Sequence, residues 1–116
     1  MLVIITNIPT PYRTAFFDEM TRIARTKKLK MKVLYCAETE PNRHWPFEPS
    51  SMQHDFEVLK GYHPSFKHIY PHINPSIFKK LKSLSPTLII CAGSWNLPTV
   101  MMAVMKRINT APIYFW

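Results

Sequence analysis

Residues 1–28, MLVIITNIPTPYRTAFFDEMTRIARTKK, decide the fold, because they read as a buried strand, a tight loop and an amphipathic helix. The apolar run 1–6 suits a strand covered on both faces, as in a parallel sheet. Thr10 is placed to cap the helix, and Pro11 occupies its first position, where the missing N–H costs nothing. This order of elements is typical of an α/β fold. Apolar residues at helical spacing are expected to pack onto the sheet: Phe16, Phe17, Met20, Ile23 and Ala24.

The rest of the chain continues the alternation of strands and helices. Four more strands are predicted, at 31–37, 55–59, 88–92 and 112–116, and the most apolar of them, 88–92, is expected to be central. The sequence therefore predicts an α/β fold with a Rossmann-like, mainly parallel sheet, helices on both faces, and a single domain over 1–116.

Two further helices complete this pattern. Asn74 and Pro75 repeat the cap and proline of the first helix, and an apolar series over 77–84 follows them. The last helix has the cleanest helical spacing, which predicts that its apolar residues face the core: Leu97, Val100, Met101, Val104, Met105 and Ile108.

Composition limits the class of protein. With 116 residues, 47% of them hydrophobic and 19% charged, the chain is long enough for one core. It has no apolar run near the ~20 residues of a membrane span and no secretory leader pattern, which predicts a cytoplasmic protein. Cys36 and Cys91 fall in predicted strands that flank the first, roughly 9 to 10 Å apart, beyond the ~7 Å limit for a disulfide.

Several chemistries are excluded by what the loops lack. The whole chain has two glycines, Gly61 and Gly93, and the loop 7–13 has none, which argues against a dinucleotide fingerprint or a phosphate-binding P-loop. The predicted strand ends carry no cluster of acidic residues, as a phosphorelay receiver would need, and no serine lies in a G-x-S-x-G elbow. No cofactor is expected, and no catalytic residue is assigned.

Ligands of open α/β sheets bind beyond the carboxyl ends of the strands, so the candidate cleft residues come from the loops there. Arg13 either binds an anion through its planar fork or lies solvated on the first turn. Trp95 either stacks on a sugar or packs at a domain interface, which is the favoured interpretation, and Asn96 is read as a helix cap. Residues 43–45 either face an acceptor or form a proline-rich rim. The candidates are Asn7, Thr10, Tyr12, Arg13, Arg43, Ser94 and Trp95.

Three of the five histidines, His63, His68 and His72, lie close together in the sequence. They suggest a metal site, but structural zinc sites use cysteine or a fixed helical histidine pair, and this spacing matches neither. A surface loop is the preferred interpretation, and no metal site is assigned.

A formal net charge of +8 points to an anionic partner. Part of the charge stabilises helix C-termini. The remainder would suit an anionic membrane surface, and nucleic acid is ranked below it because the chain shows no recognisable nucleic-acid-binding module. The predicted membrane-facing residues are Lys27, Lys28, Lys30, Lys79, Lys80 and Lys82.

Four stretches carry a resemblance to a known family: NIPTPYRTAFFDEM at 7–20, RHW at 43–45, PTLIICAGSWN at 86–96 and APIYFW at 111–116. Together they resemble the N-terminal domain of GT-B glycosyltransferases of the group called glycosyl transferases group 1 or family 4, in the subset that builds polysaccharides and lipid-linked glycans. The chain departs from that pattern twice. Many members have a glycine pair where it has Pro-Thr-Pro, and a histidine at the end of the fifth strand where it has Trp116.

The resemblance implies an acceptor-binding domain of a hexosyltransferase that moves a sugar from a nucleotide-sugar donor to a glycan or lipid-linked acceptor. The donor and an E-x7-E motif would belong to a C-terminal domain outside this chain, so the fragment is expected to be inactive alone and could form a homodimer. The expected place is the cytoplasm, peripheral to the membrane. The alternative is a non-catalytic α/β module that recruits a separate catalytic chain to an anionic membrane.

Overall fold

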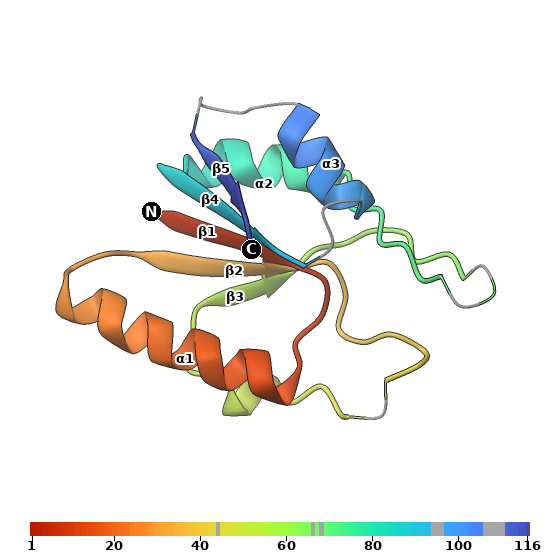
Figure 1. Ribbon diagram of the computed structural model, residues 1–116, viewed down its shortest axis with the longest axis horizontal. Coiled ribbons are helices and arrows are strands. Elements are labelled where there is room, and N and C mark those ends of the chain that lie inside the picture. Colours follow the sequence, from red (N-terminus) through yellow and green to blue (C-terminus); the bar gives the residue numbers. More distant parts are fainter. Residues whose placement is uncertain (44, 66, 68, 94–96, 106–110) are drawn as a thin grey trace.

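The computed structural model describes residues 1–43, 45–65, 67, 69–93, 97–105 and 111–116. Its strands form one parallel sheet in the order β3-β2-β1-β4-β5 (Figure 1). This confirms the predicted α/β, Rossmann-like sheet. The strands are β1 (Leu2–Thr6), β2 (Met31–Tyr35), β3 (Phe56–Val58), β4 (Leu88–Ala92) and β5 (Ile113–Phe115).

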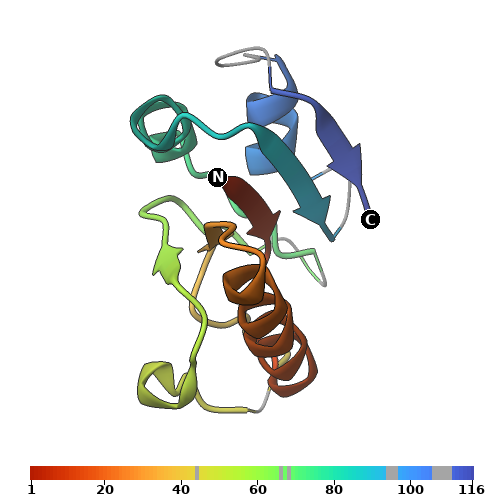
Figure 2. The same cartoon turned by 90° about the vertical axis from the view of Figure 1, so that its left-hand side faces the viewer.

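Helices cover both faces of the sheet, as predicted. Helix α1 (Pro11–Thr26) lies on one face, and α2 (Ser76–Leu84) and α3 (Pro98–Met105) lie on the other, while a short 3-10 turn (Pro49–Ser51) is found in the long loop after β2 (Figures 1 and 2). Side chains alternate along β1: Val3 and Ile5 join the core under α2 and α3, and Ile4 joins the core under α1. Burial on both faces accounts for the unbroken apolar run at the start of the chain.

The central strand is β1, and the expectation that 88–92 would be central was wrong. β1 pairs with β2 on one side and with β4 on the other. β4 lies one place further out, between β1 and the edge strand β5. A continuous apolar run therefore marks any strand covered on both faces, and it does not rank the strands from centre to edge.

Two helices bury fewer apolar residues than their sequences predicted. On α1, Phe17 is fully buried and Met20 packs on the same core, whereas Phe16 and Ile23 are exposed. On α3, Val100 and Ala103 are buried, but Met101, Val104 and Met105 are exposed, and Ile108 lies outside the described residues. An eight-residue helix that is apolar nearly all round has more apolar surface than one sheet face can cover.

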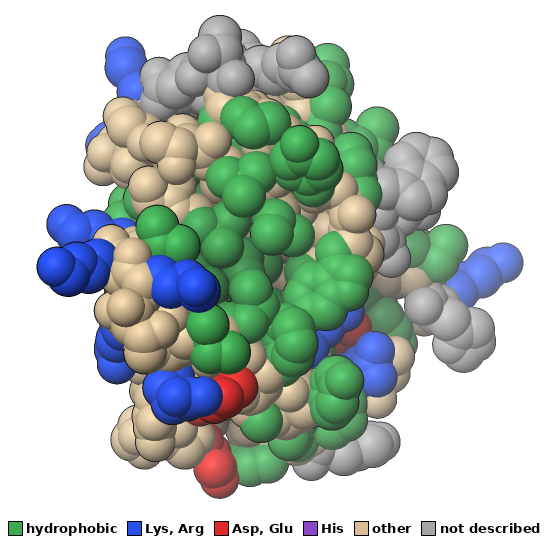
Figure 3. All heavy atoms as spheres, turned by 60° about the vertical axis from the view of Figure 1, so that its left-hand side comes forward, with side chains coloured by type: hydrophobic (Ala, Val, Ile, Leu, Met, Phe, Trp, Pro, Cys, Tyr) green, Lys and Arg blue, Asp and Glu red, His purple; other side chains and the backbone are tan. Residues whose placement is uncertain are grey.

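Among the described residues, no helix covers the α1 side of the sheet beside β4 and β5. Ile113 packs into the opposite core, so alternation places Tyr114 and Trp116 on the α1 side, where they are 61% and 62% exposed. The Trp116 ring lies 4.9 Å from the ring of Phe16. Figure 3 shows hydrophobic side chains spread across the middle of one face of the molecule.

Both cysteines are buried with free thiols, Cys36 directly after β2 and Cys91 in β4. Burial raises the pKa of the Cys36 thiol to about 12 and that of Cys91 to about 11. They therefore behave as small apolar side chains.

Candidate functional site

The loops that follow the strands gather at one end of the sheet, on the right in Figure 1. Three of them are described in whole or in large part: residues 7–10 between β1 and α1, residues 36–43 and 45–55 between β2 and β3, and residues 59–65, 67 and 69–75 between β3 and α2. Because parallel strands all end at the same edge, these loops enclose the position at which ligands of such sheets bind.

Arg13 is bound back onto the end of β1. The Thr10 side chain accepts a hydrogen bond from the Arg13 backbone N–H at 3.2 Å, which confirms the predicted helix cap. From the first turn, Arg13 Nη1 donates to Thr6 Oγ1 at 2.6 Å and to Asn7 Oδ1 at 2.5 Å. Burial lowers the pKa of Arg13, as does the nearby charge of Arg43. The guanidinium is therefore held at the end of β1, which argues against the second of the two interpretations of Arg13, a side chain that merely lies solvated on the helix.

Glu40 connects the three loops. Its carboxylate is nearly buried, and its Oε1 accepts from Asn7 Nδ2 at 3.4 Å and lies 2.7 Å from His72 Nε2. Its Oε2 lies 3.8 Å from Arg43 Nε. Sequence analysis did not single out Glu40, since its partners are up to 33 positions away and the loop around it shows no motif.

His72 is buried, at 2% exposed, so the expectation of a surface loop was wrong for it. Its Nδ1 lies 2.9 Å from Nδ1 of His63. If His72 donates from Nε2 to Glu40, its Nδ1 accepts the proton of His63. Burial lowers the pKa of the partly exposed His63, and the neighbouring His72 lowers it further. His68 lies outside the described residues, among which no group of three or more ligating side chains could hold a metal.

Asn74 ties the ends of two strands to α3. Its Nδ2 donates to the backbone carbonyls of Cys36 at 2.9 Å, Leu59 at 3.2 Å and Lys60 at 3.2 Å, and its Oδ1 lies 2.7 Å from the Thr99 hydroxyl. The prediction that Asn74 caps α2 was therefore wrong, since the helix begins at Ser76 without a side-chain cap.

The neighbouring backbone is packed closely around this asparagine. A Cβ atom added at Gly61 would overlap the carbonyl oxygen of Ile73 and the amide of Asn74. Tyr62 and Ile73 exchange two backbone hydrogen bonds, at 2.8 and 2.9 Å, and so close the hairpin that carries the two histidines. The loop after β3 is thus fixed to the sheet at its base.

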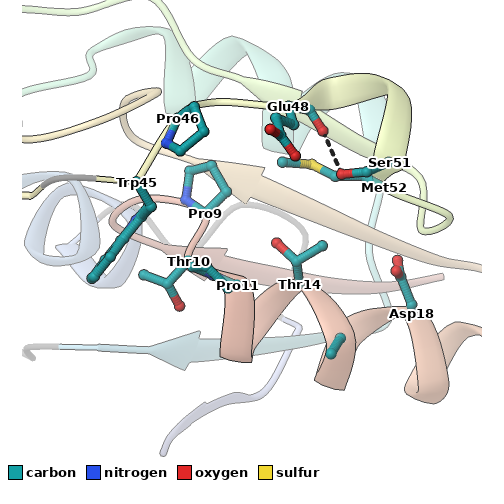
Figure 4. Close-up of a pocket in the computed structure, with 11 residues that line it drawn as sticks. Pro9, Thr10, Pro11, Thr14, Asp18, Trp45, Pro46, Glu48, Ser51 and Met52 are labelled. Carbon is teal, nitrogen blue, oxygen red and sulfur yellow. Dashed lines mark hydrogen bonds between the residues drawn. The ribbon is translucent and has the colours of Figure 1, made fainter.

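A hollow of about 270 Å³ lies between the N-terminus of α1 and the segment 45–52 (Figure 4). We call it the Asp18 hollow. Trp45 lies beside Pro9 and Thr10 at one end, and Asp18 lies at the other. The indole Nε1 of Trp45 is buried and has no hydrogen-bond partner among the described residues. Its polar lining comprises Thr10, Thr14, Asp18, Glu48 and Ser51.

Behind Asp18 lies a buried chain of hydrogen bonds. Asp18 Oδ1 accepts from the backbone N–H groups of Gln53 and His54 at 2.8 and 2.9 Å, and it lies 2.6 Å from His54 Nδ1. His54 Nε2 lies 2.8 Å from the Tyr35 hydroxyl, and burial strongly raises the pKa of Tyr35. This chain fixes the carboxylate of Asp18 against the wall of the hollow.

The pKa of Asp18 makes the stability of this wall depend on pH. Burial raises that pKa, but the hydrogen bonds from the His54 side chain and from the backbone N–H groups of Gln53 and His54 outweigh burial, so the pKa is lowered overall. A carboxyl with a depressed folded-state pKa stabilises the fold above its unfolded pKa of about 4, and that contribution is lost as the pH falls through the folded value.

We therefore expect Asp18→Asn to be less stable than the natural chain at pH 5, with a difference that narrows towards pH 3. Urea unfolding followed by tryptophan fluorescence between pH 5 and 3 measures it, in a range where histidines stay protonated in the unfolded chain. Asp55→Asn, at an exposed aspartate, is the matched control. A constant difference between Asp18→Asn and the natural chain across this range would contradict the assignment.

A second hollow, of about 450 Å³, shares Thr10, Pro11 and Trp45 with the first, and we call it the arginine hollow. The Arg43 guanidinium carbon lies 5.3 Å from the centre of the Trp45 ring. Five of the residues predicted from sequence line it together: Asn7, Thr10, Tyr12, Arg13 and Arg43.

The other predicted site residues, Ser94 and Trp95, lie outside the described part of the chain, as do His44 and Asn96. Sequence analysis missed Asp18, Glu40 and His54. The structure thus brings together the candidates of the first loop with Arg43, and it adds three side chains whose partners are distant in the sequence.

The predicted membrane-facing lysines belong to both layers of helices. Lys27, Lys28 and Lys30 follow α1, and the others lie on α2, on the opposite face of the sheet (Figure 1). Lys80 Nζ lies 2.8 Å from Glu57, so its charge is partly compensated. Among the described residues no helix has the length and apolar character that crossing a membrane requires.

Comparison of the chain with protein-family models, with curated proteins and with solved structures gives no match. The geometry of the two hollows and the sequence patterns therefore carry the functional argument.

Proposed function

We propose that this chain is the acceptor-binding N-terminal domain of a GT-B glycosyltransferase, which moves a sugar from a nucleotide-sugar donor to a glycan or lipid-linked acceptor. The observation that carries the proposal is the Asp18 hollow, where an indole ring and a set of hydroxyl and carboxylate groups meet at the carboxyl end of a parallel sheet. The family resemblance of 7–20, 43–45, 86–96 and 111–116 supports the same conclusion.

The chemistry of this hollow suits a sugar ring. An indole offers an apolar face to the C–H groups of a pyranose, and Trp45 lines the hollow. Its Nε1 has no partner among the described residues but is buried below the surface, so the ring is the part of Trp45 that the hollow presents. Carboxylates and hydroxyls accept and donate the hydrogen bonds that sugar hydroxyls make, and Asp18 is held ready by His54.

The size of the hollow limits what it binds. Ligand pockets in proteins commonly enclose about 300–1,000 Å³, and this one, of about 270 Å³, lies at the lower end. It suits one sugar residue of an acceptor, with the rest of the acceptor outside. The donor and the acidic motif would belong to the C-terminal domain that the resemblance implies, and we assign no catalytic residue here.

Titration of the ¹⁵N-labelled chain with methyl glycosides of common hexoses and N-acetylhexosamines tests the proposal. We expect the signals of the Thr10 and Thr14 amides and of the Trp45 indole N–H to shift, because these groups lie in or beside the hollow. Trp45→Ala should weaken binding about tenfold, because it removes the ring that lines the hollow. The matched control is Trp116→Ala, because Trp116 is an exposed tryptophan that directly follows β5 and does not line the hollow. This variant should bind the glycosides as tightly as the natural chain does.

The proposal would be overturned if no glycoside shifted these signals at millimolar concentration. It would also be overturned if Trp45→Ala and Trp116→Ala bound alike. Both variants need a native amide spectrum before the comparison is made.

A further inference from the structure

We infer that the arginine hollow binds a phosphate group, carried by the same acceptor whose sugar occupies the Asp18 hollow. The acceptor would then be a phosphorylated sugar or an isoprenoid-linked sugar phosphate. The link to an acceptor rests on the proposed function, whereas the binding of phosphate rests on the arginine hollow alone.

Arg13 enters the arginine hollow already fixed in position. Its side-chain hydrogen bonds to Thr6 and Asn7 both use Nη1, and a guanidinium carries five N–H donors on three nitrogens. A donor fork that the fold has already ordered loses less conformational entropy when it binds a ligand. Arg13 is therefore an ordered cation with N–H groups left for an anion.

Arg43 supplies a second cation from the facing loop. It lies against the Trp45 ring, and its nearest carboxylate oxygen, on Glu40, is 3.8 Å from its Nε. The other oxygen of Glu40 is engaged by Asn7 and His72. The ion pair is thus too long for a hydrogen bond, and the charge of Arg43 is only partly compensated.

The two cations share a hollow whose described lining contains no carboxylate. Their mutual repulsion is one reason why the pKa of Arg13 is lowered, after burial. Glu40 lies near both arginines and compensates their charges in part, but it is not among the residues that line the hollow, so a further anion placed between the two guanidiniums would be stabilised. A phosphate monoester, with a charge of about −1.5 to −2 and three oxygens, matches two guanidiniums better than a carboxylate with one charge. The diester of an isoprenoid-linked sugar phosphate carries one charge and two free oxygens, which the same two guanidiniums can share.

The arrangement also places the phosphate next to the sugar. The two hollows adjoin, because three residues line both of them: Thr10, Pro11 and Trp45. The arginine hollow lies at the first turn of α1, where the dipole of the helix favours negative charge. A sugar and its phosphate can therefore be bound side by side.

Isothermal titration of the 116-residue chain at fixed ionic strength tests the inference with five probes: glucose 1-phosphate, farnesyl phosphate, inorganic phosphate, glucuronic acid and glucose. We expect at least one phosphate ester to bind about tenfold more tightly than inorganic phosphate or glucose. Arg43→Gln should weaken that binding about tenfold. Arg25→Gln, an exposed arginine at the other end of α1, should leave it unchanged.

Arg13 is not the test position, because its side chain also holds the end of β1. Which ester binds more tightly, glucose 1-phosphate or farnesyl phosphate, identifies the sugar or the lipid as the source of the phosphate, and either result supports the inference. The inference would be overturned if Arg43→Gln and Arg25→Gln lost the same affinity for the ester, or if the esters bound no more tightly than inorganic phosphate. If glucuronic acid bound as tightly as the esters, the assignment of the hollow to phosphate would be overturned.

The outcomes separate this inference from the proposed function. Phosphate binding that depends on Arg43, with no response of the Asp18 hollow to any sugar, would keep the anion site and contradict the glycosyltransferase proposal. Binding of sugars beside Trp45 with no gain from a phosphate would keep that proposal and overturn the inference.

Discussion

Replacing Phe17 with alanine is expected to lower the free energy of unfolding by about 3–5 kcal/mol, the range for truncating a buried phenylalanine. The side chain is fully buried on the α1 side of the sheet, where its ring packs edge-on against Tyr35 and His54 at 6.4 and 5.8 Å between ring centres. Urea unfolding followed by circular dichroism at 222 nm gives the value.

The adjacent Phe16 offers a matched control. Phe16→Ala removes the same atoms from the same helix, but its ring is 37% exposed and lies against the exposed Trp116. We expect a loss of about 1 kcal/mol or less, typical of a surface position. Equal losses at the two positions would mean that α1 is rotated relative to the arrangement described here.

The second large effect is expected at Asn74. Asn74→Ala leaves the buried backbone carbonyls of Cys36 and Leu59 without the amide that they share, while the carbonyl of Lys60 keeps its hydrogen bond from the Ser76 hydroxyl. An unsatisfied buried polar group costs about 1–3 kcal/mol, so we expect a total loss of about 3 kcal/mol or more. Thermal unfolding measured by circular dichroism would show a markedly lower midpoint.

Asn42→Ala is the control for this experiment, since Asn42 is exposed in the loop after β2. It should leave the midpoint within about 2 °C of the natural value. If Asn74→Ala unfolded as late as Asn42→Ala, the loops after β2 and β3 would not depend on this amide. Some other contact would then have to hold the loops that line the two hollows in place.

The start of the chain could be predicted because its signals are local. Thr10 caps α1 and Pro11 is its first residue, as the adjacent positions indicated, and β1 lies within the apolar run. The strand 88–92 was predicted to the residue for the same reason, since Gly93 directly follows it. Arg13 and Asn7 could be placed in one site because both flank the same short loop.

The rest of the site depends on contacts that no local pattern encodes. Asp18 meets His54 across 36 positions, and Glu40 meets His72 across 32. Histidines and carboxylates are common on surfaces, so nothing in the sequence distinguishes these from solvated side chains. Only the return of the chain along β3 and the hairpin after it brings them together.

Asn74 shows that a sequence pattern typical of a helix cap can be overridden when the same side chain has other hydrogen-bond partners nearby. Asparagine followed by proline favours a helix cap, but here three carbonyls at the ends of β2 and β3 take up the same side chain. In the same way, how many apolar side chains of a helix become buried depends on the surface against which the helix packs. Met101, Val104 and Met105 follow helical spacing yet remain exposed.

The two buried thiols allow the opening of this sheet to be measured by cysteine alkylation. Burial raises the pKa of Cys36 and so keeps its thiol protonated at pH 7, whereas only the thiolate reacts with an alkylating reagent. Cys36 follows β2 and Cys91 lies in β4, on the two sides of the central strand. The alkylation rate of each cysteine therefore reports how often its own side of the sheet comes apart, and comparison of the two rates shows whether the sheet opens as one unit or from one edge.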